Sequence, residues 1–410
     1  MQIPIKSPSG ENRPVHRVSV FICILMMDGM TIYSTRQSWN LVVQPEQHLL
    51  ALIINYYSRD HVTDIRIDRN PLAYYTVPAE NLTRTAGCWT SSDKLACLRN
   101  LTSDQLYKAQ VSQQWNPIVD GDFLTDYPSS LAPQGKFIKV PLLIGANSDE
   151  GSSFGITGLD NETAIFNSLL WYRASNAYAL SPPTARKLLE LYPNDPANEP
   201  PYYINNPTIF PSKGLQWRRD AAIAGDLVMI AGRRKMCEQY TNASQTVYSY
   251  RCKYQSSHLL GPPLISNYLS VDTPLWNGAI TDGARHCKPT PSPPLLSHQL
   301  TPPPPVVNVV FSFQNISGAL GPLPKYNNYL SLSRAIGRSY ISFVNHLDPN
   351  TLMGNITVGN TTVPTWPKYE LGAPKNVVWN SNMSWVESDT WRKEGIDFIN
   401  YGGVDRELWS

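Results

Sequence analysis

The chain of 410 residues lacks an apolar run long enough to cross a bilayer, so the sequence predicts no integral membrane segment. It also lacks long runs of like charge, and its formal net charge is only +2. These absences argue against nucleic acid or an anionic membrane as a main partner. The six cysteines are too few for a disulfide-stapled scaffold and none has the spacing of metal ligands, so we expect no metal site and no cofactor.

The sequence also lacks a recognisable signal peptide. The best candidate, Val18–Met27, follows a charged, proline-containing leader and precedes no small-residue cleavage site, so we interpret it as a buried strand. The secretory route is nevertheless indicated by eight N-x-S/T sequons, at Asn81, Asn100, Asn161, Asn242, Asn315, Asn355, Asn360 and Asn382. We therefore expect a secreted glycoprotein whose sequence is incomplete or altered at its start.

Short apolar runs alternate with helical patterns along most of the chain. The apolar runs of strand length are residues 18–25, 49–57, 139–147, 246–252 and 307–313. The helical patterns are residues 91–102, 183–192, 218–240 and 329–347. Strands spaced by amphipathic helices predict an α/β fold with a mostly parallel sheet.

The segment Cys287–Asn308 does not fit this alternation. It is dense in proline, which breaks helices and central strands, so we expect an exposed, disordered loop. We treat residues 1–410 as a single domain that carries this segment as an insertion. An intron retained in the message would also explain it.

The letters GSSFG, residues 151–155, match the G-x-S-x-G pattern of a nucleophile elbow, with Ser153 as the nucleophile. An elbow needs a strand that runs directly into the first glycine and a helix right after the serine. Here five residues separate a strand end near Gly145 from the pattern, and the next helix starts only near Asn161. Glu150 is the other candidate, because α/β enzymes keep active-site groups just past their strand ends. Taken alone, the local pattern favours a surface carboxylate over an active-site acid.

The segment KVPLLIGANSDEGSSFG, residues 139–155, resembles the acid-bearing segment of the type-B carboxylesterase/lipase family, the cholinesterase-like α/β-hydrolases. The resemblance extends from about residue 71 to 400 and is strongest for secreted fungal members; it includes residues 87–106, 115–128, 339–350, 366–369 and 389–399. It implies an α/β-hydrolase fold, with a mostly parallel central sheet flanked by helices and incomplete in its N-terminal half. It also implies acyl transfer through a serine ester, on a small-molecule or lipid ester.

The resemblance assigns roles to individual residues. It implies that Glu150 is the triad acid and that His286, between DGAR and the later VVFSFQN, is the triad base, with His258 as the runner-up. The spacing of Cys88 and Cys97 leaves their pairing open, and the resemblance implies a disulfide between them. The other cysteines have no partner that spacing assigns; they are Cys23, Cys237, Cys252 and Cys287.

The nucleophile and the oxyanion loop of the family have no counterpart. The family's glycine run reads Met26-Met27-Asp28-Gly29 here, and no serine in residues 59–78 has elbow spacing. We therefore expect the acid and the base without the serine, in a chain that is inactive. Three interpretations stay open: a carboxylic-ester hydrolase by family, a non-catalytic secreted binding protein on the same scaffold, and a defective gene product.

Overall fold

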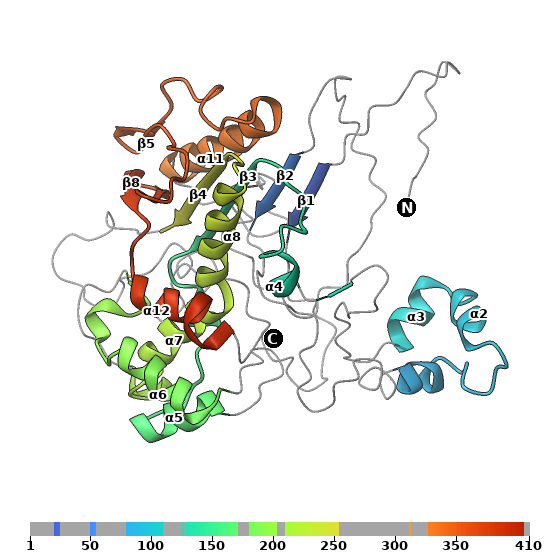
Figure 1. Ribbon diagram of the computed structural model, residues 1–410. Coiled ribbons are helices and arrows are strands. Elements are labelled where there is room, and N and C mark those ends of the chain that lie inside the picture. Colours follow the sequence, from blue (N-terminus) through green and yellow to red (C-terminus); the bar gives the residue numbers. More distant parts are fainter. Residues whose placement is uncertain are drawn as a thin grey trace, which may run out of the picture.

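The computed structural model describes residues 20–24, 50–54, 79–109, 125–126, 128–170, 180–202, 210–253, 311–312 and 327–405. These residues build a central sheet with helices on both of its faces (Figure 1). The predicted proline-rich loop, residues 287–308, lies outside the described residues.

The main sheet has six strands in the order β1-β2-β3-β4-β7-β8. Their bounds are Val20–Ile24 (β1), Leu50–Ile54 (β2), Leu142–Asn147 (β3), Val247–Cys252 (β4), Lys375–Trp379 (β7) and Trp385–Ser388 (β8). Neighbours from β1 to β7 are parallel, and only β7 and β8 pair antiparallel. The predicted α/β fold with a mostly parallel sheet is thus confirmed, although β7 and β8 were not anticipated. A separate hairpin consists of β5 (Thr357–Val358) and β6 (Thr361–Thr362).

The four predicted helical segments are helical in the structure wholly or in part, and further helices lie outside them. The helix bounds are Lys94–Arg99 (α2), Ser103–Ala109 (α3), Pro128–Leu131 (α4), Glu162–Leu170 (α5), Pro182–Leu191 (α6), Trp217–Gly225 (α7), Ala231–Asn242 (α8), Asn327–His346 (α11) and Lys393–Asp397 (α12). A π-helical turn, Asp226–Ile230, joins α7 to α8. Within the described part of the chain, no helix is long and apolar enough to span a membrane.

The two faces of the sheet are covered by different helices. On one face, Leu142 and Ile144 of β3 pack with Cys237 and Tyr240 of α8. On the other face, Leu143 of the same strand belongs to a cluster with residues of α11; the α11 members are Tyr329, Leu332, Ala335, Ile336, Tyr340 and Phe343. Alternate residues of a strand point to opposite faces, so one strand anchors both layers.

The fifth predicted strand, residues 307–313, is wrong in the part that the structure describes. Phe311 and Ser312 are helical, and Ser333 of α11 donates a hydrogen bond to the Phe311 carbonyl oxygen at 2.7 Å. The Phe311 ring is fully buried and lies 6.1 Å from the ring of Tyr329. A short apolar run fits a buried helix as well as a strand, so periodicity could not separate the two.

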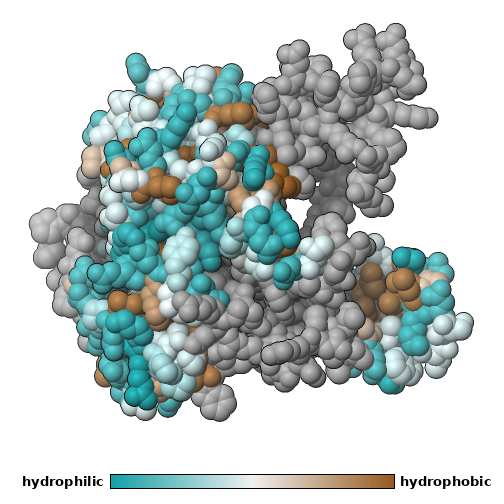
Figure 2. Space-filling view, viewed as in Figure 1, coloured by the Kyte–Doolittle hydropathy of each residue, from teal (hydrophilic) through white to brown (hydrophobic). Residues whose placement is uncertain are grey.

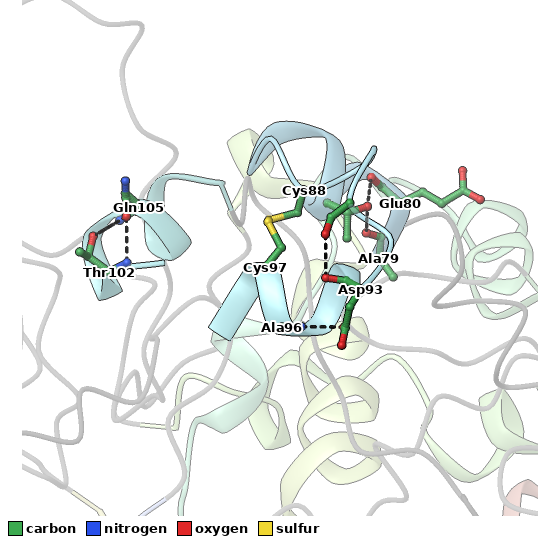
Figure 3. The surroundings of a disulfide bond; sticks show 10 residues. Ala79, Glu80, Cys88, Asp93, Ala96, Cys97, Thr102 and Gln105 are labelled. Carbon is green, nitrogen blue, oxygen red and sulfur yellow. Dashed lines mark hydrogen bonds between the residues drawn. A yellow bond between two sulfur atoms is a disulfide. The ribbon is translucent and has the colours of Figure 1, made fainter. Parts of the chain in front are cut away.

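A small helical unit carries the disulfide (Figure 3). Cys88 and Cys97 are bonded, with their Cα atoms 5.7 Å apart. The side chain of Asp93 caps α2 by accepting from the Ala96 amide at 2.8 Å. Thr102 and Gln105 form a reciprocal capping box that starts α3. The helix predicted over residues 91–102 is therefore shorter than expected and covers only Lys94–Arg99. Figure 2 shows hydrophobic surface over this unit; its exposed apolar side chains are Leu95, Leu106 and Tyr107.

A buried ion cluster links α8 to the segment after β8. Asp389 accepts two hydrogen bonds from Arg233, at 2.6 and 2.7 Å, and one from Arg234 at 3.2 Å. Tyr369 and Asn376 also donate to Asp389. Burial alone would raise the pKa of Asp389, but the charges and hydrogen bonds of the two arginines hold that pKa well below its usual range.

We predict that Asp389→Asn lowers the free energy of unfolding at neutral pH by about 3–5 kcal/mol, because Arg233 stays buried without its counter-charge. The lowered carboxyl pKa stabilises the fold above the unfolded-state pKa, and this contribution disappears as the pH falls toward the folded-state pKa. The difference between parent and variant should therefore shrink in acid, as measured by urea unfolding at several pH values. The control is Glu190→Gln, in an exposed pair with Lys187, and an equal loss there would contradict the prediction.

Candidate active site

Glu150 lies at the carboxyl edge of the sheet, just past the end of β3. The strand ends at Asn147, and after two intervening residues a short 3-10 turn covers Glu150–Ser153. Glu150 is fully buried, and its Oε1 atom accepts a hydrogen bond from the Asn147 amide at 2.8 Å. The local sequence pattern alone would allow a surface carboxylate, but the Glu150 carboxylate is buried. It lies where parallel sheets keep their functional groups.

The turn is held internally by Asp149 and Ser152. The Ser152 amide and hydroxyl both donate to the Asp149 carbonyl oxygen, at 2.9 and 2.7 Å. The Asp149 side chain reaches outward and accepts from the Tyr202 amide at 2.9 Å. Both residues are buried, and their hydrogen bonds fix the backbone of the turn that carries Glu150.

Gly151 lets this turn contact the backbone of α7. A Cβ atom added at Gly151 would lie 1.6 Å from the Ala221 carbonyl oxygen, and one added at Gly225 would lie 2.7 Å from the Gly151 amide nitrogen. Gly155 is also close, with an added Cβ 3.1 Å from Ala221 Cα. The glycines of GSSFG are thus required for helix packing, which explains their spacing without a nucleophile elbow.

The setting of Ser153 differs from that of an elbow serine. The strand β3 extends two residues beyond the predicted end near Gly145, so three residues, not five, precede Gly151. The serine closes a 3-10 turn, and the next α-helix starts only at Glu162. No helix N-terminus therefore follows Ser153 directly to stabilise an oxyanion. The side chain of Ser153 lies outside the described residues.

A segment after α6 covers the turn and is fixed by α7. The guanidinium of Arg218 donates to the carbonyl oxygens of Glu199, Pro200 and Pro201. Tyr202 follows directly and contacts Asp149 as described above. Sequence reasoning missed this segment, because a run of backbone carbonyls bound by one arginine leaves no residue pattern.

A second buried ion pair fixes the C-terminal part to the π-helical turn. Arg392 donates to both oxygens of Asp226, at 2.6 and 2.7 Å, and Tyr192 donates to the same carboxylate at 2.7 Å. Arg392 also bonds the hydroxyl of Tyr202. Burial alone would lower the pKa of Arg392, yet the Asp226 charge raises it above its usual range. The burial of Tyr192 and the Asp226 charge raise the pKa of the phenol as well.

Other predicted site residues lie outside the described part of the chain. These are His286, its runner-up His258 and the region of residues 59–78 where the elbow would be. The structure therefore describes the acid arm of the predicted site but not its base. In the residues that it does describe, no cluster of three or more His, Cys, Asp or Glu could hold a metal ion.

Six of the predicted sequon asparagines are exposed, namely Asn81, Asn100, Asn161, Asn242, Asn355 and Asn360. Asn382 is half-buried, and its Oδ1 accepts from Asn328 at 3.4 Å. Asn315 lies outside the described residues. Cys237 and Cys252 are buried.

Known proteins match this chain in sequence and in fold. The sequence profile of the carboxylesterase family matches residues 64–388. Secreted lipase 1 from Botryotinia fuckeliana is 26% identical over 339 residues, which are 78% of this chain and 47% of that protein. Lipase 2 from Diutina rugosa is 31% identical over 214 residues, 50% of this chain and 37% of that protein. The crystal structure of Aspergillus niger EstA aligns with a TM-score of 0.53 at 17% identity, covering 86% of this chain and 59% of EstA.

The parallel sheet with helices on both faces, together with the likeness to EstA, defines an α/β-hydrolase fold. The family profile spans most of the sequence, and the chain belongs to the carboxylesterase family. This confirms the resemblance that the DEGSSFG segment indicated. The chain spans less than half the length of the two lipases that it matches.

We predict that Gly151→Ala lowers the free energy of unfolding by about 1–3 kcal/mol or more, because the added methyl group meets the Ala221 carbonyl oxygen and the two backbones must separate. Chemical denaturation measures the loss. Gly372→Ala is the matched control, since an added Cβ there meets nothing within 4 Å. Equal stability of the two variants would show that α7 does not constrain the turn.

Glu199 generates a prediction of pH dependence. Burial raises its pKa from 4.5 to about 7, against the opposing effects of its backbone hydrogen bond and of Arg218. The folded chain then keeps a proton that the unfolded chain releases, so stability falls as the pH rises from 4.5 to about 7. Glu199→Gln should remove this slope and gain up to roughly 3 kcal/mol at pH 8 relative to the parent chain. Urea unfolding from pH 4 to 8 measures it, with exposed Glu370→Gln keeping the parent slope.

Proposed function

We propose that this chain is a carboxylic-ester hydrolase by ancestry that keeps the acid and the base of its catalytic site and has lost the nucleophilic serine. The observation that carries the proposal is Glu150, fully buried at the carboxyl edge of β3 on a turn held against α7. In such a site the carboxylate orients an imidazole and stabilises the imidazolium that forms during acyl transfer. His286 is the proposed imidazole.

Without the serine, no acyl-enzyme can form, and ester turnover falls roughly 10⁴–10⁶-fold below that of an intact triad. We propose that the substrate of the ancestral site was a lipid ester, which the names of the related lipases support. The exposed sequons and a relative named a secreted lipase support a secreted glycoprotein. The second candidate function is a non-catalytic binding role on the same single-domain scaffold.

The first test is ester hydrolysis by the purified full chain, with p-nitrophenyl butyrate as substrate and a fungal lipase of the family as positive control. We expect a rate roughly 10⁴-fold or more below the control. That rate should not change in Glu150→Gln, His286→Ala or Ser153→Ala. Turnover that drops tenfold or more in any of these variants would mean that the chain has a working nucleophile.

The second test examines the acid–base pair without requiring turnover. A carboxylate next to an imidazole favours its protonated form, so Glu150→Gln should lower the titration midpoint of His286 by about one pH unit or more. The midpoint is measured by NMR of histidine ring protons. His346, exposed at the end of α11, is the internal control and should not shift. If the His286 midpoint did not change, the imidazole would not be next to Glu150, and His286 would not belong to the proposed site.

A further inference from the structure

The outer face of α11 forms one wall of a groove whose lining does not include Glu150. The groove has a volume of about 390 Å³, and its other wall comes from the start of the β5 hairpin. From α11 it is lined by Ser331, Arg334, Arg338 and Ile341, and from the hairpin by Ile356 and Thr357. The α11 residues recur every three or four positions, so they share one face of the helix, opposite the face that packs on the sheet.

Arg334 and Arg338 place two positive charges one helical turn apart in this groove. Both are exposed, and neither forms an ion pair with any residue that the structure describes. Like charges at this spacing destabilise a helix, so an anion between them would relieve a repulsion that the fold leaves in place. Guanidinium groups bind carboxylates in bidentate geometry, which makes the pair suited to one carboxylate.

The next turn of α11 changes from charged to apolar. Ile341 is 54% exposed, and Ile356 faces the same groove from the hairpin and is half-buried. An inorganic anion would gain nothing from these two side chains, whereas a hydrocarbon chain that begins beside Arg338 would cover them. The groove thus presents a charged end and an apolar end in series along one helix.

From this order of residues we infer that the groove binds a single-chain carboxylate amphiphile, such as a medium-chain fatty acid. The carboxylate lies between Arg334 and Arg338, and the chain lies between Ile341 and Ile356. The groove is separate from Glu150, so binding here requires no ester turnover.

The test is isothermal titration of the full chain with decanoate, kept below its micelle concentration, and in parallel with acetate. We expect decanoate to bind with one site per chain and at least tenfold more tightly than acetate. The double variant Arg334→Gln/Arg338→Gln should weaken decanoate binding at least tenfold, and Ile341→Ser should weaken decanoate binding without affecting acetate. The charge-matched control is Arg99→Gln/Arg186→Gln, whose arginines are also exposed and lie on α2 and α6.

Three results would overturn the inference. One is equal affinity for decanoate in the groove variant and in the control variant. Another is equal affinity for acetate and decanoate, which would show a simple anion site. The third is binding to phosphatidylglycerol vesicles without binding of free decanoate, which would show a membrane-docking surface. All substituted side chains are exposed, and thermal melts of each variant verify that the fold is intact.

Discussion

The carboxyl edge of the sheet depends on the direct contact between two backbones, the Gly151 turn and helix α7. No side chain fits between them, since a single methyl group on Gly151 would overlap the Ala221 carbonyl oxygen. The contact fixes the distance from β3 to α7, and with it the position of Glu150 at the strand end. Gly225, which also approaches the Gly151 backbone closely, is the last residue of α7 before the π-helical turn begins.

Two buried arginine–carboxylate pairs extend this constraint to distant parts of the chain. Asp226 on the π-helical turn binds Arg392, and Arg233 on α8 binds Asp389. One pair joins the π-helical turn, and the other joins α8, to the C-terminal segment after β8. Because unpaired buried charges are costly, each pair strongly disfavours arrangements in which the C-terminal segment lies elsewhere. The acid turn, α7 and the C-terminal segment therefore act as one packed unit.

The sequence predicts the layered α/β fold and the position of β3 because apolar runs and helical periodicity are local signals. The strands β7 and β8 were missed, since Lys375–Trp379 is too short to stand out from other apolar stretches. Phe311 was assigned to a strand because a short apolar run fits a strand as well as a buried helix. Glu150 was found through its motif, but the packing of its turn against α7, about 70 residues further on, leaves no local signal in the sequence. Charge pairs separated by more than 150 residues, such as Asp226 and Arg392, leave no spacing that a sequence could show.

The packing of the turn also bears on what the presence of Glu150 means. In GSSFG the glycines are needed by α7, and Asp149 is needed by Tyr202, so folding alone preserves this stretch. Packing and hydrogen bonding therefore account for the residues on both sides of Glu150 without catalysis. Glu150 by itself supports family ancestry more strongly than it supports catalysis. Coupling between Glu150 and His286, which the proposed function requires, is therefore the property that would distinguish a retained catalytic pair from a retained turn.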